Sequence, residues 1–460
     1  MEKIKINNGS FRDSSGFIFE FGNIILRCIN LEYRNHYDHL IKSGLFNSLV
    51  KSNLLVNHEE VEFKTTVSET QYKIIQPTKI EDISYPYEWS FTQLKEAALL
   101  TLDIQLKSLD YNMQLKDATP YNIQFRGIHP IFIDTLSFEK IHNENYLWKP
   151  YKQFCEMFLH PLCLSAFVDP QLSKNLMISN INGISSNLIL KILPFKKKLN
   201  FSILLHIILP HYFSNKKSTN NSKSKDLIIS KDQHLRLLKQ LKGFIQGIKL
   251  NNKKTQWGQY YKQVKDEKNL YLIDKKATIS KMVTDKGLSI AWDLGANDGL
   301  FSRLIPKETS VLSMDFDWKS VEFNFKYNKE VNAFNILPLC VDLVNPSPGI
   351  GWLNNERSDI FSRLRRPDLI MGLALIHHLL HFNISLPKII ELFDLTQKYV
   401  IVEYIPFNDP KSQEIFQTVK YTFSYPTLEE FKSCFHKRFK LLEEKILTQT
   451  ERRLFLYERK

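Results

Sequence analysis

The segment Ile290–Gly299, I-A-W-D-L-G-A-N-D-G, constrains the fold of this chain more than any other. A short apolar run stops at an aspartate and turns through Gly295 and Gly299, which is typical of a strand, a tight loop and a helix starting at about Leu300. Glycines let a loop backbone approach a ligand closely, because they lack Cβ and tolerate positive φ. The start of a helix would add free N–H groups. A dinucleotide fingerprint has its second glycine where this chain has Asn297, which disfavours NAD and FAD.

Three further apolar runs follow this loop, and polar side chains lie at or just beyond their ends. Val311–Asp315 predicts a second strand, and a carboxylate at its end can accept hydrogen bonds from two ribose hydroxyls. Asn335–Leu343, with Asp342 near its end, predicts a third strand, and Pro367–Ile376 predicts a fourth. Ligands of doubly wound sheets bind beyond the carboxyl ends of the strands, so these ends are expected to form one site.

With Asp315 in register, the run Asp293–Gly299 resembles the cofactor-binding half of a class I S-adenosylmethionine-dependent methyltransferase. Strand and helix alternate over residues 290–460 as in that whole fold, so residues 251–460 are expected to form an α/β, Rossmann-like, seven-stranded methyltransferase domain. The resemblance implies that the glycine-rich loop lies against the methionine part of the cofactor, Asp315 holds the ribose and Asp342 contacts the adenine. The implied cofactor-binding residues are Asp293, Gly295, Ala296, Asn297, Gly299, Asp315, Phe316, Asp342 and Leu343.

His377 and His378 directly follow the fourth predicted strand, beside the expected methyl group. Histidine titrates near neutral pH, so either residue could remove a proton from an acceptor hydroxyl or amine, or simply hold the acceptor. The alternative is a pair of capping or core histidines. No H-x-x-x-H pattern with an accompanying acid occurs, so no metal site is predicted there.

The N-terminal half, residues 1–250, is expected to form an α+β domain with a β-rich part over 1–80 and a helical part over 90–250. Gly16–Ile29 consists of two β-rich runs divided by a Gly-Asn turn, which predicts a hairpin. Tyr33–Leu49 has apolar residues at helical spacing, which predicts one helix.

Asp117, Asn122 and Asp134 form a second candidate site in this half. Their order resembles the catalytic loop and metal-binding acid of protein-kinase-like folds, in which the first acid orients the acceptor hydroxyl while the asparagine and the second acid hold magnesium. The resemblance implies an ATP and magnesium site. The chain departs from the pattern, because Leu115–Lys116 replaces the usual His-Arg, Thr135–Leu136 replaces Phe-Gly, and no convincing glycine-rich loop or strand-three lysine is found. The alternative is a strand–loop–strand with local turn bonds.

Composition sets wider limits on the chain. Its 460 residues exceed what one hydrophobic core usually serves, which predicts two domains. The net charge of +13 could attract nucleic acid or a membrane surface, but the lysines are dispersed and the clusters Lys196–Lys198 and Lys216–Lys225 fall in predicted loops, so nucleic acid is disfavoured without being excluded. Five cysteines without a C-x-x-C pair predict no disulfide framework and fit a cytoplasmic location. The most apolar run, Phe201–Pro210, is too short to span a bilayer, so no transmembrane segment is expected.

The whole chain also resembles a bacterial family of two-part methyltransferases, some of them described as nodulation-type. The matching segments are Phe11–Phe17, Lys116–Asn122, Asn345–Pro348 and Ala374–His378. The predicted function is methyl transfer from S-adenosylmethionine to an unidentified acceptor, a small molecule or a glycan-type or lipid-type metabolite. Two alternatives stay open: an ATP- and magnesium-dependent transferase or nucleotide-binding regulator that uses the N-terminal half, and an RNA or protein methyltransferase.

Overall fold

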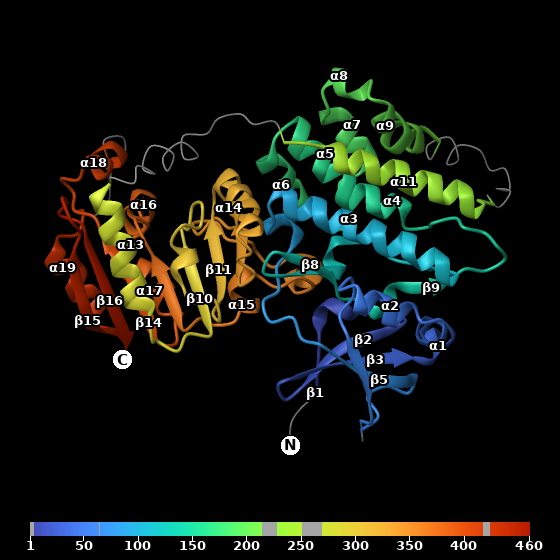
Figure 1. Cartoon of the computed structure of the whole chain (residues 1–460), viewed down its shortest axis with the longest axis horizontal. Helices are drawn as coiled ribbons and strands as arrows, with labels where there is room; N and C mark the ends of the chain where they lie inside the picture. The colour runs from blue at the N-terminus through green and yellow to red at the C-terminus, as the bar shows by residue number, and fades with distance from the viewer. Residues whose placement is uncertain (1–3, 64, 214–227, 251–268, 417–423) are drawn as a thin grey trace. The chain divides into compact units, whose positions relative to one another are not determined.

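The computed structural model describes residues 4–63, 65–213, 228–250, 269–416 and 424–460 (Figure 1). The chain divides into two compact units. Unit 1 comprises residues 1–125, 130–252 and 348–363, and unit 2 comprises residues 126–129, 253–347 and 364–460. The domain boundary predicted near residue 250 adjoins residues 251–268, which lie outside the described residues, as does the predicted lysine-rich loop at residues 216–225.

Unit 2 is built on a seven-stranded sheet of order β12-β11-β10-β13-β14-β16-β15 (Figure 1). The strands are β10 (Ile290–Leu294), β11 (Ser310–Asp315), β12 (Ile336–Cys340), β13 (Leu369–Gly372), β14 (Tyr399–Tyr404), β15 (Phe439–Ile446) and β16 (Arg453–Arg459). All neighbouring pairs from β12 to β14 are parallel, and β16 runs antiparallel to both β14 and β15. The four predicted strands are confirmed as β10 to β13, and β12 and β13 are shorter than the ranges predicted for them. The chain leaves β12 at one edge and returns as β13 beside β10, which creates a topological switch point at the carboxyl ends of β10 and β13.

Both faces of this sheet are covered, as β16 illustrates. Leu454 and Leu456 belong to an apolar cluster that includes Ile279 of α13, whereas the ring of Tyr457 stacks on that of Phe435 of α19 on the other face. Alternation with a period of two is the consequence of strand geometry. The helices of unit 2 are α13 (Leu270–Val283), α14 (Trp318–Glu330), α16 (Ile376–His381), α17 (Leu386–Phe393), α18 (Pro410–Phe416) and α19 (Leu428–His436).

The connection from β10 to β11 contains no α-helix, although one was expected from about Leu300. Only a 3-10 turn, Ser302–Leu304, forms in this fully described connection. Pro306 accounts for the difference, because the residue before a proline is driven out of the α region, and Ile305 is indeed extended, with φ −70° and ψ 140°. The first α-helix after the loop is therefore α14, which follows β11.

The β-rich part of unit 1 is a five-stranded sheet of order β1-β2-β3-β5-β4. Its strands are β1 (Ile4–Ile6), β2 (Gly16–Phe21), β3 (Ile24–Asn30), β4 (His58–Val61) and β5 (Gln71–Pro77), and every neighbouring pair is antiparallel. The predicted hairpin is confirmed as β2 and β3. The single helix predicted over Tyr33–Leu49 is instead two helices, α1 (Arg34–Lys42) and α2 (Leu45–Lys51), because Gly44 adopts φ +83° between them.

The rest of unit 1 is mainly helical. The elements along this part of the chain are α3 (Phe91–Ser108), β6 (Met113–Leu115), β7 (Ile123–Arg126), β8 (His129–Phe132), β9 (Phe138–Lys140), α4 (Tyr151–Phe154), α5 (His160–Phe167), α6 (Pro170–Ser179), α7 (Ser186–Ile192), α8 (Phe195–Lys198), α9 (Phe201–Ile203), α11 (Lys231–Gly247) and α15 (Ile360–Arg363). Residues 126–129, from the end of β7 to the start of β8, belong to unit 2. The Lys196–Lys198 cluster lies in the short helix α8 and not in a loop as predicted. No helix in the described part of the chain is long and apolar enough to cross a membrane.

A buried ion pair fastens α13 to the carboxyl end of β14. Nζ of Lys275 lies 2.6 Å from Oε2 of Glu403, and the two side chains are 4% and 0% exposed. The hydroxyl of Tyr271 donates to the other carboxylate oxygen, Oε1, at 2.9 Å. Without Lys275, Glu403 would remain as a buried charge without a cation.

We therefore expect Lys275→Met to lower the free energy of unfolding by about 3–5 kcal/mol, because a buried pair broken on one side leaves an uncompensated charge. Lys281→Met on the same helix is the matched control. Its Nζ pairs with Glu443 at 3.0 Å but the lysine side chain is 73% exposed, so the loss should stay below about 1 kcal/mol. Urea unfolding measures both. A double variant, Lys275→Met with Glu403→Leu, should recover much of the loss; if it does not, packing of the lysine stem and not the charge explains the effect.

Candidate cofactor and acceptor site

The loop after β10 is held in a conformation that needs special residues. Gly295, Asn297 and Gly299 have φ values of +70°, +50° and +72°. Asparagine is among the few residues with a side chain that enter this left-handed region routinely. A Cβ on Gly299 would lie 2.2 Å from Oδ1 of Asn324 on α14, so no larger residue fits there without movement. The loop is thus a tight cradle packed against α14.

The amide groups of this loop are used within the protein. The N–H groups of Gly295 and Ala296 both donate to the carbonyl of Met314 at the end of β11, and that of Gly299 donates to Ala296. Asn297 N–H donates to Oδ2 of Asp315 at 2.7 Å. The helix expected from about Leu300, which would have added free N–H groups, does not form, and the amides of this loop fasten it to β11. Because these amides are already hydrogen-bonded, the loop would contact a ligand through its shape and not through these N–H groups.

Asp315 ends β11 and is 7% exposed. Its Oδ2 accepts from Asn297 N–H and its Oδ1 from Asp317 N–H at 2.8 Å. Burial raises the pKa of Asp315 to about 6, although these amide hydrogen bonds favour the ionised form. Each carboxylate oxygen has two lone pairs, so both can accept one further bond, which is the requirement for two ribose hydroxyls. The next residue, Phe316, is 59% exposed and lies at the same strand end.

Asp293 lies beneath the loop, at 2% exposure. Its Oδ2 accepts from the Ser302 hydroxyl at 2.6 Å, and that hydroxyl is hydrogen-bonded to the Ser313 hydroxyl at 2.9 Å. Nδ2 of Asn324 donates to Ser313 at 2.8 Å, which joins β10, the 3-10 turn, β11 and α14 in one chain of bonds. Burial raises the pKa of Asp293 to about 7, despite the hydrogen bond from Ser302. These bonds give Asp293 a supporting position under the loop.

Asp342 and Leu343 follow β12, the neighbour of β11. Val341 N–H donates to the carbonyl of Asp315 at 2.8 Å, which brings this segment beside the end of β11. Asp342 is partly exposed, and its Oδ1 accepts from Val344 N–H at 2.9 Å. The carboxyl ends of β10, β11 and β12 therefore lie together at the same end of the sheet.

His377 and His378 lie on α16, directly after β13, with ring centroids 4.1 Å apart. His377 is 4% exposed, and its Nδ1 is buried with no hydrogen-bond partner among the described residues. Burial holds the pKa of His377 well below its usual value, and His378, Arg452 and Lys275 lower it further. Burial, with a smaller effect of His381, lowers the pKa of His378 to about 4. The expectation of titration near neutral pH is therefore not met. Both imidazoles are neutral at pH 7, but their lowered pKa values make them weak bases, which suits holding an acceptor better than removing its proton.

Sequence reasoning did not select the charged network beside His377. The Tyr271 hydroxyl donates to Glu403 and accepts from Nη1 of Arg452 at 3.1 Å, and Arg452 binds Asp409 through two nitrogens at 2.8 and 3.0 Å. The signal was present, because Glu403 interrupts an apolar strand where a charge is costly without a partner. A small pocket at this edge is lined by Ile376, His377, Leu380, Glu403, Tyr404, Ile405, Tyr425, Pro426 and Phe431.

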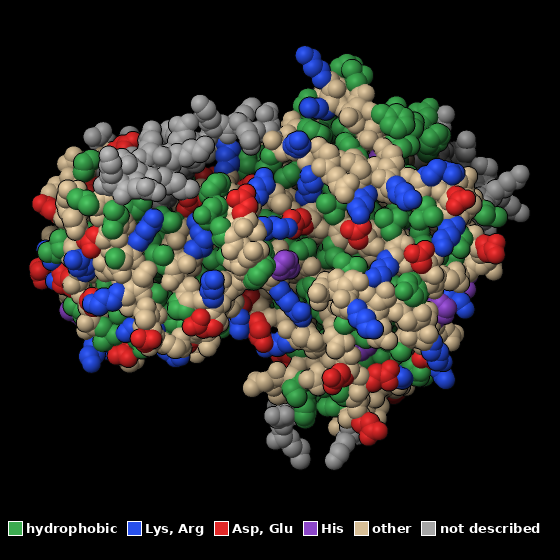
Figure 2. Space-filling model, in the orientation of Figure 1, with side chains coloured by type: hydrophobic (Ala, Val, Ile, Leu, Met, Phe, Trp, Pro, Cys, Tyr) green, Lys and Arg blue, Asp and Glu red, His purple; other side chains and the backbone are tan. Residues whose placement is uncertain are grey.

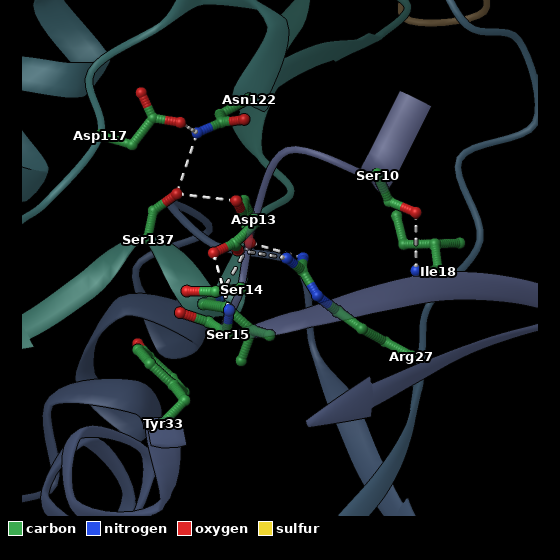
Figure 3. A network of polar contacts seen from close by, with 12 residues as sticks. Ser10, Asp13, Ser14, Ser15, Ile18, Arg27, Tyr33, Asp117, Asn122 and Ser137 are labelled. Carbon is green, nitrogen blue, oxygen red and sulfur yellow. Dashed lines mark hydrogen bonds and ion pairs between the residues drawn. The ribbon is translucent and has the colours of Figure 1, made fainter. Parts of the chain in front are cut away.

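In unit 1, hydrogen bonds join Asp117, Asn122 and Asp134 through Ser137. Figure 3 shows Asp117, Asn122 and Ser137 side by side. Nδ2 of Asn122 donates to Asp117 at 3.2 Å and to the Ser137 hydroxyl at 2.9 Å, and that hydroxyl donates to Asp134 at 2.8 Å. Nη1 of Arg27 on β3 lies 2.5 Å from Oδ1 of Asp134. Burial raises the pKa of Asp134, but Arg27 and the hydrogen bonds outweigh it and the net pKa is lowered.

The same figure shows how the loop before β2 joins this network (Figure 3). Asp13 lies 3.6 Å from Nη2 of Arg27 and 3.0 Å from Nζ of Lys116, which also donates to the Ser15 hydroxyl. Burial, followed by the charge of Asp134, raises the pKa of Asp117. Within the described residues, no group of three or more His, Cys, Asp or Glu side chains is arranged to hold a metal ion.

Comparison with known proteins places the chain in a family. No protein-family model matches it. Nodulation protein NoeA of Rhizobium meliloti (strain 1021) is 30% identical over 463 aligned residues, which cover 98% of this chain and 95% of NoeA. The chain belongs to the NoeA family. The resemblance to a nodulation-type family is thereby confirmed. The strand order of unit 2, with its antiparallel β16 between β14 and β15, is that of class I methyltransferases, and the predicted enzyme class, an S-adenosylmethionine-dependent methyltransferase, is confirmed with it.

Solved structures similar to part of the chain include three methyltransferases. Magnesium protoporphyrin IX methyltransferase from Synechocystis PCC 6803, with bound SAM, is 14% identical over 46% of this chain and 87% of its own, with a TM-score of 0.31. The N-methyltransferase NodS from Bradyrhizobium japonicum WM9 is 9% identical over 42% of this chain and 98% of its own, also with a TM-score of 0.31. The bifunctional kinase-methyltransferase WbdD is 19% identical over 42% of this chain and 39% of its own, with a TM-score of 0.28. The strand order, and not these low scores, identifies the fold of unit 2.

The raised pKa of Asp293 predicts how stability depends on pH. Its folded pKa of about 7 lies above the unfolded value of about 3.9, so the folded state binds the extra proton and this carboxyl group destabilises the fold progressively as pH rises from about 4 to 7. Asp293→Asn removes the charge, so its melting temperature relative to the native chain should be several degrees higher at pH 8 than at pH 5.

Asp368→Asn provides the matched control, because Asp368 is a buried acid at the amino end of β13. Burial raises its pKa, but hydrogen bonds from the amide of Ser289 and from Lys398 outweigh this and lower it. Its stabilising contribution is present above the unfolded pKa and is lost as pH falls, so this variant should lose stability at pH 8. Equal behaviour of the two variants in thermal unfolding would contradict the assignment of Asp293 as a destabilising buried charge.

Proposed function

We propose that unit 2 binds S-adenosylmethionine at the Gly295–Gly299 loop and transfers its methyl group to an acceptor held beside His377. The observation that carries this proposal is the Asp315 carboxylate, which is fixed by two backbone amides and retains lone pairs at the end of the strand beside the loop. This arrangement suits the two hydroxyls of a ribose. Gly295, Ala296 and Asn297 would lie along the methionine part.

The remaining cofactor residues fit the adenosine part. Asp342 is partly exposed and can accept from an exocyclic amine, and Phe316 provides an exposed ring for the base. Leu343 follows Asp342 and adds an apolar side chain. Asp293 acts through Ser302 and Ser313 and keeps the loop in place without touching the cofactor.

Methyl transfer requires alignment of the acceptor with the methyl group more than it requires acid–base catalysis. S-adenosylmethionine supplies a methyl group that its sulfonium already activates. The chain must hold the acceptor atom in line with that methyl group and exclude water. His377 is suited to hold an acceptor hydroxyl or amine, because it is neutral and its Nδ1 has no partner within the described residues. Next to His377 lie Tyr271, Lys275 and Glu403, which a hydrogen bond and an ion pair hold in fixed positions.

We propose a small molecule or a glycan-type or lipid-type metabolite as the acceptor. The side chains around His377 are mostly aromatic and aliphatic, with few polar groups among them, and small-molecule sites have a lining of this kind. The name of NoeA refers to nodulation and specifies no acceptor. Methylation of RNA or protein is the alternative, and assays of methyl incorporation with each acceptor class distinguish the two.

Calorimetric titration with S-adenosylmethionine tests the cofactor site. Above pH 6, where Asp315 is ionised, Asp315→Asn should weaken binding at least about tenfold, because each charge-assisted hydrogen bond contributes about 1.5–3 kcal/mol. Asp368→Asn is the control. The carboxylate of Asp368 also accepts two backbone N–H groups, from Ser289 and Ile290, but it lies at the amino end of β13, whereas the proposed site lies at the carboxyl ends of the strands. Unchanged affinity in Asp315→Asn, or equal loss in both variants, would contradict the proposal.

A second candidate function, nucleotide binding by unit 1, is favoured by the hydrogen bonds that join Asp117, Asn122 and Asp134 through Ser137. We propose that this unit is kinase-like in fold, on the support of its antiparallel sheet followed by a helical part that carries these residues. Arg27 already neutralises Asp134, so a magnesium ion would have to compete with a guanidinium group.

Titration with ATP, with and without magnesium, tests this second candidate. Because of the Arg27 ion pair, we expect any ATP binding to show no requirement for magnesium. Asp134→Asn should leave S-adenosylmethionine affinity unchanged. Magnesium-dependent ATP binding that Asp134→Asn abolishes would instead establish the N-terminal half as a metal-dependent nucleotide site, and absence of ATP binding under both conditions would remove this function.

A further inference from the structure

The segment from α7 to the residue after α9 carries large apolar side chains on its outside. Phe195, Leu199 and Phe201 are 74%, 74% and 69% exposed, and Leu204 is 39% exposed. Monomeric proteins seldom expose several large apolar side chains close together, and such patches mark interaction sites. We call this the α8–α9 surface, made of Lys191, Phe195, Lys196, Lys197, Lys198, Leu199, Phe201 and Leu204.

These exposed side chains are not the outer rim of the core. The same segment has a separate inner face, on which Ile189, Leu193, Ile203 and Ile207 are between 0% and 3% exposed. That inner face anchors the segment to the helical part of unit 1. Because the anchoring is complete without them, Phe195, Leu199 and Phe201 contribute little to folding.

Basic side chains surround this apolar group. Lys191, Lys196 and Lys197 are exposed and Lys198 is half-exposed. Figure 2 shows hydrophobic and basic side chains together at the top of the helical part, over α8 and α9. Residues 170–213 contain five lysines and no aspartate or glutamate. The surface is therefore positively charged, with no acid in its own segment to offset the lysines.

We propose that the α8–α9 surface docks the protein onto an anionic lipid bilayer. The lysines would lie among the anionic headgroups, and the apolar side chains would enter the boundary with the acyl chains. A polyanion such as RNA would bind the lysines and could stack on the phenylalanines, but it would not explain the exposed Leu199 and Leu204. A lipid boundary accommodates aromatic and aliphatic side chains alike, so the composition of the surface favours a membrane.

Docking of this kind lies on the membrane and does not cross it. The described helices are too short or too polar to span a bilayer. The proposal does not rest on methyl transfer, because every residue in it belongs to unit 1 and lies outside the cofactor site.

Sedimentation of the full chain with lipid vesicles tests the proposal. Vesicles of equal parts phosphatidylcholine and phosphatidylglycerol should bind the protein, vesicles of phosphatidylcholine alone should bind it at least about tenfold more weakly, and added salt should weaken the binding. Phe195→Ser with Leu199→Ser and Phe201→Ser should lower the affinity at least about tenfold. Lys196→Glu with Lys197→Glu and Lys198→Glu should abolish binding.

Matched variants in the β-rich part of the same unit separate this surface from general effects. Ile6→Ser with Ile24→Ser and Leu31→Ser changes three other exposed apolar residues, and Lys5→Glu with Lys42→Glu and Lys51→Glu makes the same change in charge. Both should bind vesicles as the native chain does. Thermal unfolding checks that all variants are folded, and S-adenosylmethionine affinity should be the same in all of them.

Three results would overturn the proposal. The native chain could fail to bind the anionic vesicles, or the matched variants could lose binding as strongly as the surface variants. The apolar variant could also bind vesicles fully while a single-stranded RNA binds the native chain and not the lysine variant. That third outcome would assign the surface to a polyanion.

Discussion

The close approach of Gly299 to Asn324 is the contact on which the proposed cofactor site depends. A turn that passes so near α14 brings the loop back under the end of β11, where its amides bond to Met314 and Asp315. Asn324 also donates to Ser313, which connects to Ser302 and Asp293 beneath the loop. The loop is therefore supported from below by a bonded series of polar side chains and from the side by a helix that follows β11. Its shape is a property of the packed unit and not of the ten residues that form it.

Charge at the carboxyl edge of the sheet is arranged in a way that suits a cationic ligand. Asp293 and Asp315 are buried acids whose pKa values are raised by burial, so a nearby positive charge would stabilise their ionised forms. On the other side of the switch point, Lys275 and Arg452 are matched by Glu403 and Asp409. His377 stays neutral beside them, which avoids adding a further positive charge near a sulfonium.

In unit 1, the acidic side chains are balanced by charge in a different way. Asp13 and Asp134 pair directly with Arg27 and Lys116, so these charges are balanced within the protein. Asp117 contacts no such cation at comparable distance within the described ion pairs, and its pKa is raised. The positively charged α8–α9 surface is a separate feature, because its lysines lie in a segment without acids. The two halves thus present different kinds of surface to ligands.

Much of the chain could be predicted from sequence because local patterns decide it. The apolar strand before Gly295, the acid at Asp315, the hairpin at β2 and β3 and the alternation along β16 follow from backbone freedom and from the periodicity of strands. By itself the sequence determined the class of fold, the position of the proposed cofactor loop and the family resemblance. Tertiary structure decided what depends on distant partners: that the loop amides bond to β11, that burial lowers the pKa of His377, and that Lys275 reaches Glu403 across 128 positions of sequence. Burial and pairing arise only when remote segments pack together, and no local pattern records them.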